Sequence, residues 1–116
     1  MTSPLTAEQA VQQQLDAYNA HDLAAFLAVY DENVRIHRPP ATEPTMVGRA
    51  ALGHFHGSQR FNLPRLHAAL LRRVVAGNTV VDHERVTGLT EQPFEVVVVY
   101  QVQDGRITGV WYFPAA

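Results

Sequence analysis

One segment, residues 10–39, constrains the fold of this chain more than any other. Its apolar residues change spacing along the way and predict helix, break, helix and strand in that order. Val11, Leu15 and Tyr18 recur at helical spacing and form one apolar stripe. A second stripe predicts a helix from Leu23 to Tyr30. Because two short helices and a strand cannot bury these stripes alone, later parts of the chain must cover them.

Polar side chains predict where both helices begin. Thr6 and Gln9 have the spacing of a capping box, in which each side chain bonds a free backbone donor of the first turn. That helix is expected to end near Tyr18. Asp22 can cap the second helix, because its carboxylate accepts from the first free N–H groups.

The rest of the chain shifts from helical spacing to alternation. A strand around Val34 and Ile36 ends at Pro39-Pro40, and a short helix from Arg49 is expected to end near Gly57. Four further strands are predicted at 66–75, 79–89, 94–103 and 106–113, with turns at 77–78, 90–93 and 104–105. This order indicates an α+β fold with helices on one face of a mixed, mainly antiparallel sheet.

Composition limits the classes of function. With 116 residues and 47% hydrophobic residues, the chain is expected to be one ordered domain, 1–116. The net charge of -2, without a basic stripe, argues against nucleic acid or an anionic membrane as partner. The absence of cysteine excludes disulfides and thiol catalysis. A polar amino terminus and no apolar run of about 20 residues predict a cytoplasmic protein without a signal peptide or membrane span.

The strand predicted at 94–103 has apolar residues on both of its faces. One face is almost wholly apolar: Phe94, Val96, Val98, Tyr100 and Val102. The opposite face has an apolar centre at Val97 and Val99, and Trp111 and Phe113 continue the pattern in the last strand. Helices can cover only one face of a sheet, so a second subunit is the simplest cover for the other, and a homodimer is predicted.

Three sequence motifs resemble a known family. They are YNAHDLAAFLAVYDENVRIHRP at 18–39, GRAALGHF at 48–55 and VVVVYQVQDGRITGVWYF at 96–113. Their order and spacing resemble the NTF2-like superfamily in its SnoaL-like and ketosteroid (steroid delta)-isomerase-like branch. The resemblance implies a cystatin-like cone, in which three amino-terminal helices pack on a curved, mainly antiparallel sheet around an apolar pocket. It does not imply one function, because this fold hosts many.

The catalytic set of ketosteroid isomerase does not carry over. The tyrosine of the first helix falls on Gln14, the carboxylate base on Arg38, and the second acid on or near Val98. An arginine cannot accept a proton near neutral pH, and a valine cannot donate a hydrogen bond. The chain is therefore not expected to isomerise enones by that mechanism.

The resemblance and the strand and helix patterns suggest a pocket wall. Its predicted members are Gln14, Tyr18, Phe26, Arg38, Phe55, Val98, Tyr100 and Tyr112. Arg38 shares the apolar side of its strand and could bind a ligand carbonyl or carboxylate, or pair with Glu43, or else lie at the surface. Gln14 could face a ligand or border the apolar stripe, and Tyr18 could be core or pocket wall.

Three residues are candidates for acid–base chemistry: His56, His83 and Asp82. His56 matches a position where the family often places a pocket tyrosine, although a histidine near a helix end also interacts favourably with the helix dipole. Alternation puts Asp82 and Glu84 on one face of their strand and His83 and Arg85 on the other. Because the hairpin register is unknown, either face could look inward, and a cross-strand ion pair on the outer face is the alternative.

Other members of the fold use different sets. Epoxide hydrolases use Asp-Arg-Asp and dehydratases a His-Asp pair, which Arg38 or Arg85 with Asp82, or His83 with Asp16, could imitate. No histidine spacing lies on a single face as metal ligands require, so neither a metal nor a cofactor is expected.

Two functional hypotheses remain. The first is an enzyme, such as an isomerase, cyclase, dehydratase or hydrolase-like lyase, that acts on a small apolar molecule with a carbonyl or carboxylate. The second is a non-catalytic ligand-binding or dimerisation module. A titratable group with a plausible partner on the pocket wall would favour the first.

Overall fold

The computed structural model describes residues 4–115, which form three helices and six strands. The helices are α1 (Ala7–Ala20), α2 (Leu23–Ala28) and α3 (Arg49–Gln59). The strands are β1 (Tyr30–His37), β2 (Met46–Val47), β3 (His67–Ala76), β4 (Thr79–Thr87), β5 (Phe94–Gln103) and β6 (Arg106–Ala115). Within these residues, no helix is long and apolar enough to cross a membrane.

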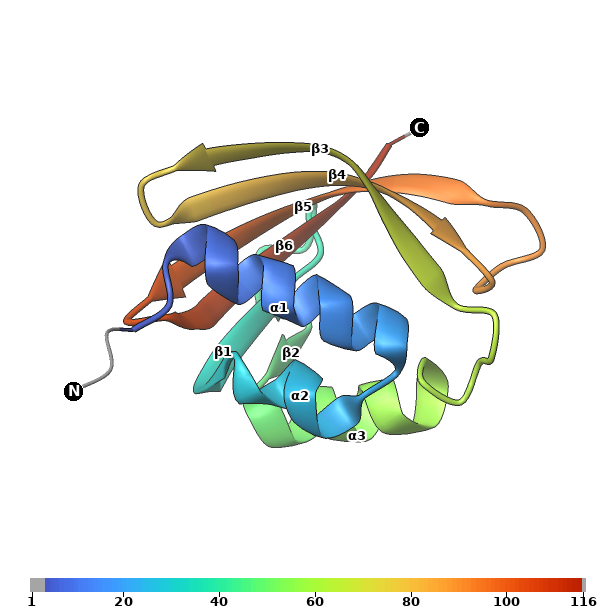
Figure 1. Cartoon of the computed structure of the whole chain (residues 1–116), viewed down its shortest axis with the longest axis horizontal. Helices are drawn as coiled ribbons and strands as arrows, with labels where there is room; N and C mark the ends of the chain where they lie inside the picture. The colour runs from blue at the N-terminus through green and yellow to red at the C-terminus, as the bar shows by residue number, and fades with distance from the viewer. Residues whose placement is uncertain (1–3, 116) are drawn as a thin grey trace.

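One mixed sheet contains all six strands in the order β2-β1-β6-β5-β4-β3. Only β1 and β6 pair in parallel, while the other neighbours are antiparallel. The sheet curves, and α1 lies across its concave side with α2 and α3 beside it (Figure 1). The predicted α+β class, its three helices and its mainly antiparallel sheet are confirmed.

The predicted helix caps are present. The Thr6 hydroxyl accepts from the backbone N–H of Gln9, whose side chain accepts from that of Thr6. Asp22 accepts from the N–H of Ala25 and starts α2. The first helix runs two residues beyond the predicted Tyr18, to Ala20.

The second helix is shorter than predicted. It ends at Ala28, and Tyr30 begins β1 instead of completing the helical stripe. The reason is tertiary, because Ile107 of β6 donates to the Val29 carbonyl at 2.8 Å and pairs with Tyr30 in the sheet. A long-range strand pairing here outweighs a local helical spacing.

Other boundaries also differ from the sequence prediction. The strands expected at 66–75, 79–89 and 106–113 span His67–Ala76, Thr79–Thr87 and Arg106–Ala115. The third helix continues through Gly57 to Gln59, and a Cβ on Gly57 would lie 3.3 Å from the Leu23 side chain, so the small residue allows α3 to pack on α2. The predicted loop after Pro39-Pro40 contains the short strand β2, whose two residues pair with Arg35 and Ile36.

The hydrophobic core lies between the helices and the concave face of the sheet. Phe26 and Val98 are almost completely buried in it. The end of α1 is fastened to the edge strand β3, because the Asn19 amide donates to the Ala68 carbonyl at 2.9 Å and accepts from its N–H at 2.8 Å. His21 also bonds the Leu66 carbonyl at 2.8 Å. These contacts fix the distance between α1 and the sheet.

Strand pairing shows which side of β4 faces inward, because Asp82 lies opposite the buried Val98 of β5 and Glu84 opposite Val96. On β3, Arg73 lies opposite Asp82, and a bulge between Leu70 and Arg72 brings Leu70 opposite Glu84. The buried, inward residues of β4 are Val80, Asp82, Glu84 and Val86, while His83 lies on the other face.

Candidate functional site

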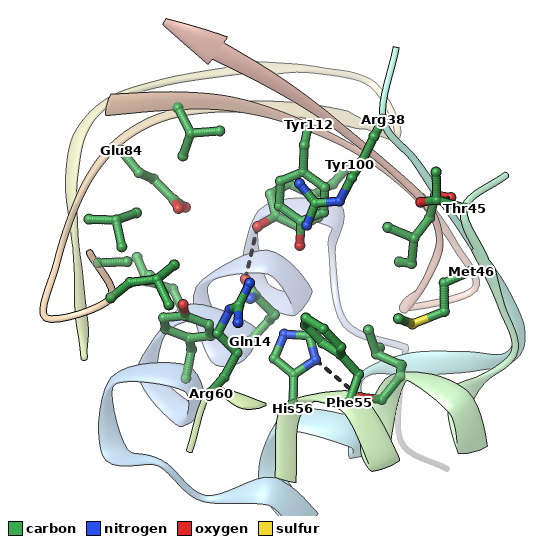
Figure 2. Close-up of a pocket in the computed structure, with 18 of the residues that line it drawn as sticks. Gln14, Arg38, Thr45, Met46, Phe55, His56, Arg60, Glu84, Tyr100 and Tyr112 are labelled. Atoms are coloured by element: carbon green, nitrogen blue, oxygen red, sulfur yellow. Dashed lines mark hydrogen bonds between the residues drawn. The ribbon is translucent and has the colours of Figure 1, made fainter. Parts of the chain in front are cut away.

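A cavity of about 380 Å³ lies between α1, α3 and the concave face of the sheet. Apolar and aromatic side chains form most of its wall, and a few polar groups interrupt them (Figure 2). The lining residues are Gln14, Leu15, Tyr18, Ile36, Arg38, Thr45, Met46, Leu52, Phe55, His56, Arg60, Ala68, Glu84, Val86, Leu89, Phe94, Val96, Tyr100 and Tyr112. Such a volume and composition are typical of small-molecule sites.

Glu84 is the acidic residue of this wall. Its side chain extends from β4 into the cavity (Figure 2), and the residue is only 6% exposed. The carboxyl oxygen Oε2 is buried and has no hydrogen-bond partner within residues 4–115. Burial, followed by the negative charge of Asp82, raises the pKa of Glu84 from 4.5 to about 7, while Arg73 opposes the rise. The carboxyl can therefore exist in both protonation states near neutral pH.

Asp82 lies two residues before Glu84 on the same face, but its environment is different. Arg73 donates to both carboxylate oxygens of Asp82, from Nε at 2.7 Å and from Nη2 at 2.9 Å. Arg73 also donates to the Gln12 side chain at 2.8 Å, which ties β3 to α1. Asp82 is completely buried in this bidentate pair.

Strand pairing explains why only one of the two acids has a counter-ion. The neighbours of Asp82 across the sheet are Arg73 on β3 and Val98 on β5. The neighbours of Glu84 are Leu70 and Val96, both apolar. Two carboxyl groups in unlike environments are a recurrent arrangement for acid–base chemistry, because their proton affinities are driven apart.

His56 enters the cavity from α3 and is 6% exposed. Its Nδ1 lies 3.1 Å from the Leu52 carbonyl, so Nδ1 carries a proton and donates, which leaves Nε2 as an acceptor. Burial among aromatic rings, including Phe26 at 4.6 Å between ring centroids, lowers the pKa of His56 from 6.5 to about 4. The positive charges of Arg60 and Arg38 lower it further. His56 is thus neutral near pH 7.

Tyrosine hydroxyls supply hydrogen-bond donors to the cavity. Tyr100 donates to the Gln14 side chain at 3.3 Å. Burial raises the pKa of Tyr112 to about 12, with smaller effects of Arg38, Glu84 and Arg60, and burial also raises the pKa values of Tyr18 and Tyr100. These hydroxyls therefore keep their protons at neutral pH, and those of Tyr18 and Tyr112 can donate to a ligand oxygen.

Two arginines lie on the cavity wall. The Arg38 guanidinium stacks on the Tyr112 ring at 4.5 Å, and that of Arg60 stacks on the Phe55 ring at 4.7 Å. Figure 2 shows both guanidinium groups turned toward the space between them. No carboxylate of residues 4–115, Glu43 included, lies within salt-bridge distance of either group.

The comparison with protein families identifies the chain. The model of the SnoaL-like domain matches residues 11–110. The chain belongs to the SnoaL-like family. No curated protein matches it.

Solved structures have the same fold as this SnoaL-like protein. A candidate ketosteroid isomerase from Kribbella flavida has a TM-score of 0.81 and 22% identity, over 95% of this chain and 78% of its own. A SnoaL-like protein of unknown function from Burkholderia thailandensis has a TM-score of 0.79 and 21% identity, over 95% and 94%. An LEH-like epoxide hydrolase from Mycobacterium tuberculosis has a TM-score of 0.78 and 18% identity, over 94% and 82%. At these identities the likeness concerns the fold.

The SnoaL-like protein brings most of the predicted pocket residues together. Those that line the cavity are Gln14, Tyr18, Arg38, Phe55, His56, Tyr100 and Tyr112. Phe26 and Val98 instead pack in the core beside it. His83 lies on the convex face, where its Nε2 is 2.6 Å from a Glu95 oxygen. Asp82 is buried in its pair with Arg73 and is not part of the wall.

Sequence reasoning did not select Glu84 and Arg60 as site residues. A signal for Glu84 was present, because Val80 and Val86 have the same parity as Asp82 and Glu84 and mark that side of β4 as the inward one. Arg60 follows α3 in a segment without periodicity, so no pattern pointed to it. Within residues 4–115, no group of three or more His, Asp or Glu residues is arranged to hold a metal ion.

Proposed function

We propose that this SnoaL-like protein binds a small, largely apolar molecule in the cavity and acts on it by general acid–base catalysis. The observation that carries the proposal is the Glu84 carboxyl, which is buried, unpaired at one oxygen and turned into an apolar cavity. A structural carboxyl in such a place would cost stability without a partner, so a role toward a ligand accounts for it best.

Glu84 would exchange the proton in this mechanism. In its ionised form it removes a proton from a carbon beside a ligand carbonyl, and in its protonated form it returns that proton to another atom of the same ligand. The Tyr112 hydroxyl on the same wall can donate to the carbonyl oxygen and stabilise the negative charge that develops there. Neutral His56, with Nε2 as an acceptor, can orient a ligand hydroxyl. Such a set suits an isomerase, a cyclase or a lyase.

The alternative is a cavity that binds a ligand without chemistry. The apolar part of the wall supports both proposals equally. They differ on Glu84, because a binding protein needs only its hydrogen bond to the ligand and would work with an amide in its place. The titratable group on the wall favours the enzyme.

A small apolar probe can separate them. The ring of 5-nitrobenzisoxazole opens when a base removes one proton from carbon, and the phenolate product is coloured. We expect a rate above buffer that rises through pH 7 and falls by about 10²-fold or more in Glu84→Gln. Glu91→Gln, at an exposed loop position, is the matched control and should keep the rate.

Two outcomes would count against the enzyme. If Glu84→Gln keeps the wild-type rate, Glu84 is not the base. If calorimetry shows that the probe binds but neither protein opens it, the non-catalytic alternative is favoured.

We also propose that two copies associate through the convex face of the sheet. Val97, Val99 and Trp111 lie there, Phe113 is 41% exposed, and the Trp111 ring stacks on His37 with 4.7 Å between ring centroids. Light scattering should give twice the 12.9 kDa of one chain at micromolar concentration. Val99→Lys should split the dimer, because it would bury an unpaired charge. A wild-type monomer under these conditions would remove this proposal.

A further inference from the structure

The two arginines of the cavity have free hydrogen-bond donors. A guanidinium that stacks on an aromatic ring is held in one plane, and the N–H groups at its edge remain available. Arg38 is held in this way by Tyr112 and Arg60 by Phe55. Within residues 4–115, the Arg60 side chain makes one hydrogen bond, from Nη1 to the Gln59 carbonyl at 2.8 Å.

Both positive charges act on the same part of the cavity. Arg38 and Arg60 each lower the pKa of His56, and each lowers that of Tyr112 against the effect of burial. The charges that act on Glu84 are instead those of Asp82 and Arg73. The geometry agrees, because Arg38 stacks on Tyr112 and Arg60 on Phe55 with their guanidinium groups turned toward the space between them (Figure 2). The charge of Glu84 also acts on Tyr112, but within residues 4–115 no carboxylate lies at salt-bridge distance from either arginine, so Glu84 is not their counter-ion.

The two guanidinium groups thus give the cavity wall positive charge, and most of the remaining wall is apolar. Arg38 is exposed and Arg60 is half-buried, so water can reach their free N–H groups in the empty cavity. A ligand that displaces this water without offering an acceptor would bind less favourably. One carboxylate satisfies both, because it has two oxygens with about four acceptor positions.

We propose that the ligand of this cavity is a monocarboxylic acid, bound as its anion by Arg38 and Arg60, with an apolar body that reaches Glu84. This inference rests on the proposed function, because it assumes that the cavity binds a small molecule. It adds the charge of the ligand and the orientation of the ligand in the cavity. The carboxylate lies between the guanidinium groups of Arg38 and Arg60, and the reacting carbon lies in the apolar part of the cavity beside Glu84.

A matched pair of probes tests the inference by calorimetry. Naphthalene-2-acetate and naphthalene-2-acetamide share one apolar body and differ in the charge of the end group. At pH 6 the acetate is ionised, and Glu84, with its pKa of about 7, is mostly neutral and does not repel it. We expect the acetate to bind about tenfold or more tightly than the amide, with a preference that decreases as salt is added.

Variants then locate the preference. The double variant Arg38→Gln/Arg60→Gln should bind both probes with similar affinity. Arg38→Lys/Arg60→Lys keeps the charge but loses the planar fork, and should retain a part of the preference. Arg106→Gln is the matched control, because Arg106 is exposed at the start of β6, outside the cavity wall. Circular dichroism confirms that each variant is folded.

Each remaining outcome is decisive. If the wild type binds acetate and amide equally, the carboxylate inference is overturned and the proposed cavity function stands. If the preference survives in the double glutamine variant, the carboxylate does not bind to these arginines and the inference also fails. If neither probe binds, ligand binding in the cavity is itself contradicted, and the inference falls with it.

Discussion

The difference in unfolding free energy between Glu84→Gln and the wild type should change with pH. It should be more favourable to the variant at pH 8 than at pH 5. The substitution keeps the size of the side chain and removes its titration. In the wild type, burial penalises the charged form of Glu84 and raises its folded-state pKa from the ordinary 4.5 to about 7. The folded state therefore binds this proton more tightly than the unfolded state does.

The sign and size follow from proton linkage. A carboxyl with a raised folded-state pKa contributes most to stability below pH 4.5, and this contribution is lost as the pH rises through 7. Between pH 5 and pH 8, a shift of this size amounts to about 2 to 3 kcal/mol of unfolding free energy. The wild type should lose this amount relative to Glu84→Gln over that interval. Because Glu84 is only 6% exposed, solvent screening does not greatly reduce the figure.

Urea unfolding at a series of pH values measures the effect. The quantity to plot is the difference in unfolding free energy between Glu84→Gln and the wild type. The other titrating groups occur in both proteins, so their contributions to this difference largely cancel. An effect of the amide that does not depend on pH adds a constant to the difference and leaves its pH dependence unchanged. A difference that stays constant within about 0.5 kcal/mol from pH 5 to pH 8 would show that Glu84 titrates normally, and the acid–base proposal would lose its main support.

Four further predictions concern the surroundings of this group. Phe26→Ala should lower the unfolding free energy by about 3 kcal/mol in urea melts, because it empties an aromatic cluster, and a loss below about 0.5 kcal/mol would contradict its core position. Arg73→Met should lower the unfolding free energy by about 3 kcal/mol, because it leaves Asp82 buried and unpaired. The double variant Arg73→Met/Asp82→Asn should recover part of this loss, and an equal loss in the single and the double variant would show that the pair is not coupled. As the pH falls from 6.5 to 4.5, the wild type should lose about 2 to 3 kcal/mol of unfolding free energy relative to His56→Gln, because the pKa of His56 is lowered from 6.5 to about 4 in the folded state. An equal pH dependence of unfolding in both proteins would contradict the burial argument. An unconjugated enone steroid should show no turnover above buffer in a steady-state assay, whereas turnover that Gln14→Ala abolishes would contradict the mechanism argument.

Several features of the fold could be predicted from local sequence because local contacts determine them. The cap at Thr6 depends on residues three apart, and the bounds of β5 follow from its run of valines. The hairpin at Asp104-Gly105 depends on a left-handed backbone at both residues, which glycine and aspartate adopt readily. The prediction that the second helix reaches Tyr30 was wrong. Tyr30 pairs instead with Ile107 in the sheet, and this partner lies 77 residues away in sequence.

The candidate site was only partly predictable. Tyr18 lines the cavity because the inward face of a helix follows from its spacing, whereas His56 was found through its match to a family pocket position. Phe26 also lies on the inward side of its helix but packs in the core. Helical spacing predicts that a side chain faces inward, but not whether it meets other side chains or a cavity.

The sequence by itself determined the order of the elements, their apolar faces and the absence of a ketosteroid isomerase set at Gln14, Arg38 and Val98. Only the tertiary structure decided the roles of the two acids on β4. The hairpin register that starts at Ala76 and Thr79 places Arg73 opposite Asp82, and the bulge beyond Arg72 brings Leu70 opposite Glu84, whose neighbour on β5 is Val96. Side chains in a strand alternate with a period of two, so a shift of one residue in register exchanges the faces, and no local pattern encodes that shift. The proton affinity of Glu84 is therefore a property of strand pairing.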